Sequence, residues 1–200
     1  MSTELVREVA PLSLATRSQY TIKRSLFSFL ERIFRVYTPD GQIFMFVKHP
    51  VLKLREEFQV WADEAQSKPL LLVKSKQVIA INFAYEVTDQ QTGQVLGSVQ
   101  KKGLASILRD KFILLDATGT EIGYAEEQGA SLLRRFLRFL PGKHAIFVGG
   151  AQVATIHQRF RFFAREFDVD LQGSPLDPRF VLAVALLALM ADARREDSGS

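Results

Sequence analysis

Hydrophobic and polar residues alternate along most of the chain, in short segments separated by tight turns. The segment "IFRVYTPDGQIFMFVK" alternates in this way on both sides of one such turn. The turns fall at Asp40-Gly41, Thr92-Gly93, Thr118-Gly119 and Gly149-Gly150, and a longer loop separates "FQVW" from "LLLVK". Glycine-containing turns between alternating segments are the strongest local signal of a β-hairpin. The pattern therefore predicts a series of hairpins between Tyr20 and Leu171.

The hairpins form a degenerate repeat. Their opening aromatic residues recur at intervals of 24 to 27 residues, at Phe34, Phe58, Tyr85 and Phe112. Together with the flanking segments "QYTIKR" and "RFRFFAREFDVDL", the hairpins amount to about 12 strands. A twisted sheet of that size tends to close on itself, and the interior of such a barrel is too wide for strand side chains alone to fill.

A helix is predicted at the C-terminal end, over residues 178–193. Every residue from Phe180 to Ala191 is apolar, so the helix must be enclosed on all sides. Asp177 stands at the N-cap position before Pro178, and arginines follow at the other end. The apolar run is about 12 residues, whereas a membrane span needs about 20. These features favour a helix that fills the barrel over a membrane-inserting segment or an oligomer interface.

The predicted fold is mainly β: a closed antiparallel barrel of about 12 strands that encloses an apolar C-terminal α-helix. It forms a single domain over residues 19–193, between flexible segments at 1–18 and 194–200. A further helix is predicted at 130–140, "ASLLRRFLRFL", with leucines and phenylalanines on one side. Its other side carries Arg134, Arg135 and Arg138, which either lie on a membrane surface or belong to a cap over one mouth of the barrel.

The amino-acid composition excludes several classes of protein and favours certain partners. The formal net charge is +4, which weakly favours anionic partners. The chain has no cysteine, which excludes a disulfide scaffold, a thiol nucleophile and a thiolate metal site, and fits a reducing cytosol. The N-terminal segment has no apolar stretch typical of a signal peptide. We therefore expect a cytoplasmic protein.

Motifs for catalysis are missing from the sequence. His49, His144 and His157 follow no metal-binding spacing, and no nucleophile elbow, P-loop or dinucleotide-binding motif occurs. The adjacent pairs Glu56-Glu57 and Glu126-Glu127 would point to opposite faces of a strand. The sequence thus predicts neither an enzyme nor a bound cofactor or metal.

Basic residues are the better candidates for function. Lys48, Lys74 and Lys101 each stand near the end of the second strand of a hairpin, and equivalent ends should meet at one end of a barrel. The candidate site for an anionic lipid headgroup comprises Lys48, Lys74, Lys76, Lys101, Lys102 and Arg109. The alternative is that these lysines only provide solubility and protect strand edges.

A second basic set lies in "HQRFRFFAR", where Arg159, Arg161 and Arg165 alternate with apolar residues. We interpret it as one barrel strand with its basic face in water. RNA binding is not favoured, because the aromatic residues would face away from the bases.

The segments "FRVYTPDGQIFMFVK", "YEVTDQQTGQVLGSVQKK" and "FDVDL…LDPRFVLAVALLALMAD" resemble the tubby C-terminal-like superfamily, in its LURP-one-related and phospholipid-scramblase-like branch. The resemblance runs from Gln19 to Ala193 and implies a 12-stranded barrel threaded by its last helix. It also implies contact with membrane lipids, since tubby-like domains bind phosphoinositide headgroups through basic residues. Asp168, Asp170 and Asp177 lie near the calcium segment of scramblases but lack the EF-hand pattern, so calcium stays open as a ligand.

The expected function is that of a non-catalytic module that recognises anionic phospholipid headgroups, peripherally at the inner face of a membrane and not as an integral membrane protein. Two alternatives remain. One is a scramblase-like protein that moves lipids; the other is a scaffold or regulatory protein that binds a protein or nucleic-acid partner.

Overall fold

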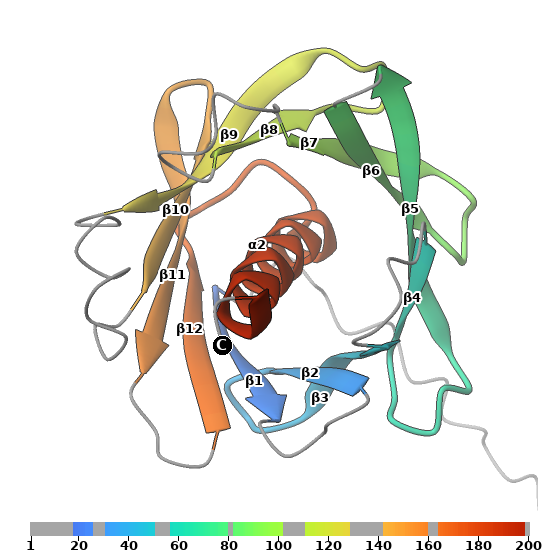
Figure 1. Cartoon of the computed structure of the whole chain (residues 1–200), viewed down its shortest axis with the longest axis vertical. Helices are drawn as coiled ribbons and strands as arrows, with labels where there is room; N and C mark the ends of the chain where they lie inside the picture. The colour runs from blue at the N-terminus through green and yellow to red at the C-terminus, as the bar shows by residue number, and fades with distance from the viewer. Residues whose placement is uncertain are drawn as a thin grey trace, which may run out of the picture.

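A computed structural model describes residues 18–25, 31–50, 57–79, 82–101, 111–128, 142–159 and 164–198. Twelve strands form one closed barrel in which every neighbouring pair is antiparallel, so the predicted fold is confirmed (Figure 1). The strands are β1 (Gln19–Ser25), β2 (Glu31–Tyr37), β3 (Ile43–Pro50), β4 (Glu57–Trp61), β5 (Pro69–Ile79), β6 (Asn82–Asp89), β7 (Val95–Lys101), β8 (Lys111–Leu115), β9 (Glu121–Gln128), β10 (Lys143–Val148), β11 (Ala151–Arg159) and β12 (Ala164–Leu171).

The two ends of the barrel differ in how the strands are joined. At one end, here called the turn end, short turns join β2 to β3, β4 to β5, β6 to β7, β8 to β9 and β10 to β11. The predicted glycine turns are confirmed there: Gly41 and Gly119 have φ angles of 80° and 87°, in the left-handed region that glycine adopts without strain. The opposite end is here called the connection end. The segments that join the strands there are 26–30, 51–56, 80–81, 102–110, 129–141 and 160–163, which lie outside the described residues.

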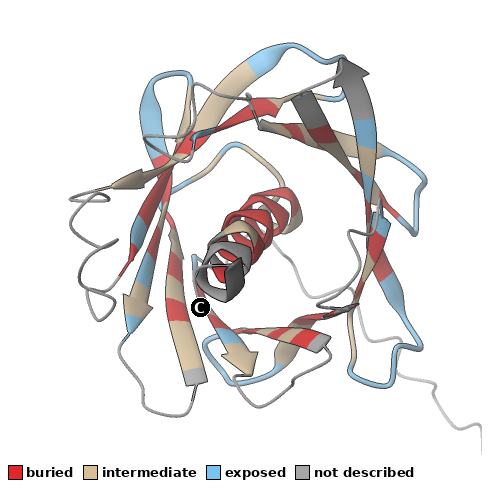
Figure 2. Cartoon of the chain, in the orientation of Figure 1, coloured by how far each residue is buried: buried red, intermediate tan, exposed pale blue. Residues whose placement is uncertain are grey.

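The helix α2 (Pro178–Ser198) runs through the middle of the barrel (Figure 1). All side chains from Phe180 to Met190 are buried, which confirms that the apolar run is enclosed by protein (Figure 2). The Asp177 carboxylate accepts a hydrogen bond of 2.8 Å from the Arg179 backbone N–H, as an N-cap does. The helix ends at Ser198 and not at 193, so the predicted tail is largely helical. No proline or glycine interrupts it before Gly199, a residue type that commonly follows a helix C-terminus.

Inward-facing strand residues pack around this helix. The repeated aromatic residues Phe34, Phe58, Tyr85 and Phe112 stand on β2, β4, β6 and β8, and all of them belong to the core or pack against it. Gly97 on β7 allows a close approach of helix and wall. A Cβ atom there would stand 2.7 Å from the Phe180 ring and 2.7 Å from the Leu115 carbonyl oxygen. The first turn of the helix is thus seated against a strand position without a side chain.

The interpretation of residues 157–165 as a single strand is wrong. β11 ends at Arg159 and β12 begins at Ala164, because the chain reverses direction between them. Arg159 points outward and pairs with Asp168, whereas Arg165 shares the inward alternation of Phe167 and Val169. Arg161, the helix predicted at 130–140 and the connecting segments 51–56 and 102–110 lie outside the described residues.

Candidate functional site

The lysines singled out from the sequence lie on strands that run in the same direction. Lys48 on β3 and Lys76 on β5 stand in the halves of their strands nearer the connection end, Lys74 is at the centre of β5, and Lys101 is the last residue of β7. Val47 and Val73 are fully buried inside the barrel, whereas the neighbouring Lys48 and Lys74 are exposed. Because side chains alternate across a strand, Lys48, Lys74 and Lys76 project from the outer wall.

Carboxylates separate these lysines. The Lys74 ammonium lies 3.7 Å from the Glu57 carboxylate of β4, and Lys76 forms an ion pair with Glu86 of β6. The Lys74–Glu57 pair is exposed on both sides, so it contributes little to stability. In the other pair, Lys76 is exposed and Glu86 is partly buried. The described wall of β4, β5 and β6 therefore alternates in charge around Lys74 and Lys76.

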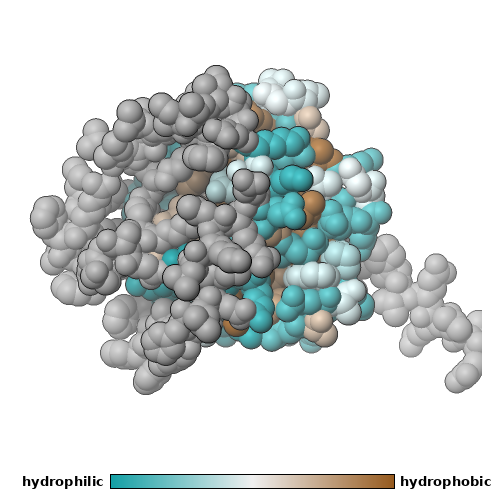
Figure 3. Space-filling view, turned by 45° about the vertical axis from the view of Figure 1, so that its right-hand side comes forward, coloured by the Kyte–Doolittle hydropathy of each residue, from teal (hydrophilic) through white to brown (hydrophobic). Residues whose placement is uncertain are grey.

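The other predicted basic residues belong to the connections. Lys102, Arg109, Arg134, Arg135 and Arg138 lie outside the described residues, as does the side chain of Lys101. The outer surface turned toward the viewer in Figure 3 is mainly hydrophilic, with hydrophobic residues in separate small groups. The described wall on this side thus offers no broad apolar surface.

A second set of polar residues lies on the inner face of the barrel near the connection end, in three pairs of register partners. It comprises Arg24, Arg32, His49, Glu127, His144 and Arg165, and is here called the inner cluster. Arg32 and His49 are register partners on β2 and β3, with exposed fractions of 9% and 3%. Two residues further into the barrel on each strand, Phe34 and Val47 are fully buried, so both polar residues continue the inward row.

The remaining members follow the same alternation. Arg24 and Arg165 are register partners on β1 and β12, in the inward rows of Ile22 and Phe167. His144 on β10, 3% exposed, is the register partner of Glu127 on β9. The His49 ring meets Phe58 edge-on at a centroid distance of 5.8 Å. Three arginines, two histidines and one glutamate thus share the inner face of this end.

Sequence reasoning missed the inner cluster, although a signal for it existed. The histidines are far apart along the chain, and no spacing motif links them. Arg24 and Arg32 each stand two residues from a fully buried apolar residue on the same strand, Ile22 and Phe34. Strand alternation alone would therefore have placed both arginines inside.

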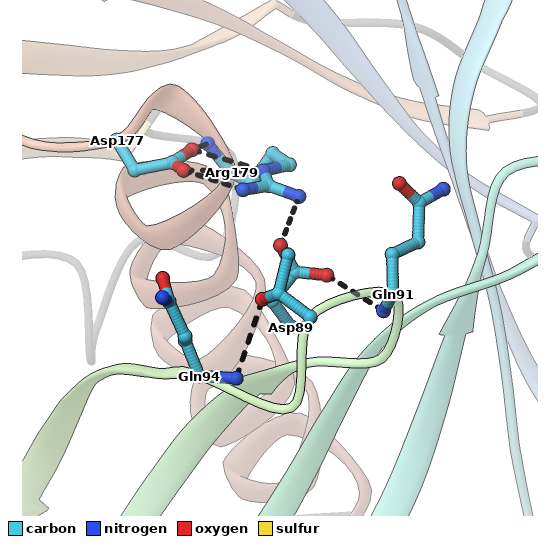
Figure 4. A network of polar contacts seen from close by, with 6 residues as sticks. Asp89, Gln91, Gln94, Asp177 and Arg179 are labelled. Carbon is cyan, nitrogen blue, oxygen red and sulfur yellow. Dashed lines mark hydrogen bonds and ion pairs between the residues drawn. The ribbon is translucent and has the colours of Figure 1, made fainter.

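A third polar group fixes the helix at the turn end (Figure 4). The Arg179 guanidinium donates to the Asp177 carboxylate at 2.7 Å and to the Asp89 carboxylate of β6 at 2.9 Å. The side chains of Arg179 and Asp89 are 13% and 5% exposed. Burial opposes ionisation of Asp89, but hydrogen bonding from the Gln91 N–H and the Arg179 guanidinium outweighs it and lowers the pKa of this carboxyl. The network ties the start of the helix to the wall.

The three aspartates that were considered as calcium ligands each have different neighbours. Asp168 pairs with Arg159, Asp177 with Arg179, and Asp170 is in register with Gln19 and Thr155. Within the described ranges, no group of three or more histidine, aspartate or glutamate side chains is arranged to hold a metal ion. In the same part of the chain, no helix is long and apolar enough to cross a membrane.

No protein-family model matches the chain, and no curated protein matches it. Among solved structures, it is similar to the X-ray structure of a protein from Arabidopsis thaliana, with 14% sequence identity and a TM-score of 0.52. The similarity covers 92% of this chain and 98% of that one. At this identity the likeness concerns the fold, and it supports the barrel over almost the whole chain.

Proposed function

We propose that this protein is a non-catalytic module that binds anionic membrane surfaces with the connection end of its barrel. The sequence resemblance to tubby-like and LURP-one-related proteins also supports membrane binding. On the basis of that resemblance, we propose that the chain belongs to this branch. The observation that carries the membrane-binding proposal is a separation of residue types between the two ends. Acidic residues are concentrated at the turn end, and basic and bulky apolar residues are concentrated at the connection end.

Acidic side chains gather at the turn end. Asp63 and Asp116 stand in turns whose backbone and hydroxyl groups hydrogen bond to their carboxylates. The Ser67 N–H bond to Asp63, and the Thr118 hydroxyl bond to Asp116, lower the pKa of each carboxyl, so both stay ionised at neutral pH. Further acidic residues at this end are Asp40, Glu64, Asp89, Glu121, Asp170 and Asp177.

The connections at the opposite end are basic and apolar in sequence. Their basic residues are Lys53, Arg55, Lys102, Arg109, Arg134, Arg135, Arg138 and Arg161, and their acidic residues are Glu56 and Asp110. The strand ends beside them carry both signs: the acidic residues are Glu31, Glu57, Glu126, Glu127 and Glu166, and the basic residues are Arg24, Arg32, Lys48, Lys76, Lys101, Lys111, Lys143, Arg159 and Arg165. Basic residues therefore outnumber acidic residues at this end. Bulky apolar residues recur in "LFSFL", "SLLRRFLRFL" and "FRFF". The turns at the other end contain one bulky apolar residue, Leu176. This combination of cationic and apolar side chains suits the interface of an anionic bilayer.

Each lysine or arginine near an anionic surface contributes about 1 kcal/mol of binding free energy. Glu57 and Glu86 reduce the contribution of Lys74 and Lys76 on the wall, so the connection residues should dominate. Liposome co-sedimentation tests this division. Replacing Arg134, Arg135 and Arg138 with Gln should weaken binding to phosphatidylserine-containing vesicles more than a hundredfold, since 1.4 kcal/mol is a factor of ten.

Two matched variants complete the experiment. The triple change of Lys48, Lys74 and Lys76 to Gln should weaken binding less than the arginine triple. Lys68→Gln removes one cation from the turn end and should leave binding unchanged. Equal binding of wild type to vesicles with and without anionic lipid would reject the proposal. A dithionite assay with labelled lipid would identify a scramblase, through bleaching of the inner leaflet.

A further inference from the structure

We infer that the turn between β4 and β5, residues 62–68, is a strap that opens and closes over an aromatic pair on the outer wall, Phe46 and Trp61. The Arg35–Glu64 ion pair holds the strap closed. This inference is independent of membrane binding by the connection end, because the strap belongs to the turn end of the barrel. Opening of the strap exposes an aromatic surface that the closed barrel conceals.

The burial of Phe46 is the first observation. Its neighbours Met45 and Val47 are fully buried in the core, so alternation directs Phe46 to the outer face of β3. A large outward side chain on a barrel wall would normally contact water, yet Phe46 is only 4% exposed. Its register partner Trp61 stands beside it on β4 and is half-buried itself. A further group must therefore cover the Phe46 ring from outside the wall.

Arg35 provides this cover. It is the register partner of Phe46 on β2, and its guanidinium carbon lies 5.5 Å from the centroid of the Phe46 ring. The Arg35 Nε and Nη2 donate to the two carboxylate oxygens of Glu64, at 2.9 and 3.0 Å. Because β3 lies between β2 and β4 in the barrel, this bidentate pair reaches across the outer face of β3. The strap is thus fastened over the strand that carries Phe46.

The strap has hydrogen bonds of its own that keep its shape. The Asp63 carboxylate accepts from the Ser67 N–H at 3.0 Å and from the Ser67 hydroxyl at 2.9 Å. The Ala62 N–H donates to the Lys68 carbonyl oxygen at 2.9 Å, which closes the base of the turn. These bonds lie within the strap and do not involve β2 or β3. The strap can therefore move as a unit when its ion pair with the wall breaks.

The ion pair is weak enough to break. The side chains of Arg35 and Glu64 are 27% and 44% exposed, and ion pairs in contact with water contribute little to stability, although bidentate geometry strengthens them. Hydrogen bonding from Arg35 lowers the pKa of Glu64, so its carboxylate is charged at neutral pH. Shielding of the aromatic pair from water also favours closure. Few interactions therefore separate the closed state from the open one, and loss of the ion pair shifts the population toward the open state.

Trp61 is the only tryptophan of the chain, so its fluorescence reports on this site alone. Glu64→Gln leaves Arg35 over Phe46 but releases the strap. This variant should shift the Trp61 emission to the red and increase its quenching by acrylamide, because water and quencher reach the indole ring. It should also bind more ANS, a dye for exposed apolar surface.

Salt provides a second test on the unmodified protein. In wild type, raising NaCl to about 1 M, where screening acts over about 3 Å, should shift the Trp61 emission in the same direction as Glu64→Gln does. The same titration should change the Glu64→Gln emission less, because its strap is already released. Arg159→Gln breaks an ion pair with Asp168 elsewhere on the outer wall and is the matched control. Its Trp61 emission, quenching and salt response should equal those of wild type.

The outcomes are distinct. Unchanged emission and quenching of Trp61 in a folded Glu64→Gln variant would overturn the inference, because the turn would then stay closed without its ion pair. If thermal melting shows that this variant does not fold cooperatively, the salt titration of wild type decides. A red shift with salt then supports the strap, and constant emission overturns it.

Discussion

At the scale of single residues, glycine and a buried ion pair determine how the helix enters the barrel. Gly97 leaves room for the Phe180 ring, and Asp89 holds Arg179. Both contacts join residues more than 80 positions apart in the chain. A substitution at either contact therefore tests whether the start of α2 packs against the barrel wall as described.

Gly97→Ala should destabilise the protein. The added methyl group would overlap the Phe180 ring and the Leu115 carbonyl oxygen, each 2.7 Å away, and overpacking of this kind costs about 1–3 kcal/mol. Urea unfolding followed by circular dichroism measures the loss. Phe180→Leu in the Gly97→Ala background should recover part of it, because the smaller side chain removes one of the two overlaps. If the double variant is no more stable than Gly97→Ala alone, the contact between Gly97 and the Phe180 ring is contradicted.

Asp89→Asn should lower the free energy of unfolding by about 3 kcal/mol at neutral pH, because it leaves the buried Arg179 with a weaker partner. The pKa of Asp89 is lowered in the folded state, so its charge stabilises the fold above its unfolded pKa. This contribution is lost as the pH falls through the lower folded value. The difference between wild type and variant should therefore shrink below about pH 4. Urea titrations at several pH values measure it, and a difference independent of pH would argue against the ion pair.

At the scale of elements, α2 acts as the hydrophobic core that the strands surround. Leu186 is fully buried at its centre. Leu186→Ala should cost about 2–5 kcal/mol, and Leu186→Asp, which buries an unpaired carboxylate, should unfold the domain. Thermal melting of purified protein measures both. Ala117→Asp, in the exposed turn between β8 and β9, is the control and should melt close to wild type. A cooperative melt of Leu186→Asp near the wild-type temperature would show that the helix is not the core.

At the scale of the whole molecule, the separation of charge between the barrel ends predicts how the protein sits on a membrane. Because the chain has no cysteine, single labelling sites can be introduced freely. A polarity-sensitive dye at Lys76→Cys, near the connection end, should shift to the blue on anionic vesicles. The same dye at Ala117→Cys, at the turn end, should not. Salt should reverse the shift, since screening acts over about 8–10 Å. Equal shifts at both positions would contradict a fixed orientation.

Much of this organisation could be predicted from the sequence, because its determinants are local. Alternation defines strands, glycine turns define hairpins, and an apolar run too short for a bilayer defines an enclosed helix. The N-cap at Asp177 and the turns at Gly41 and Gly119 follow from residue type alone. The end of α2 was misplaced because the apolar pattern stops before the helix does. The junction after Arg159 is not evident from the sequence, because basic and apolar residues continue to alternate from 159 to 162, beyond the end of β11.

The candidate site depended on tertiary structure. Whether Lys74 adds to a cationic patch depends on Glu57, which comes beside it only through the pairing of β4 with β5. The meeting of Arg24 with Arg165 requires closure of the barrel between its first and last strands. Residue type and spacing determine strands, turns and the buried helix, since these depend on neighbours along the chain. Register and closure decide which charges meet, because they join residues from opposite ends of the sequence.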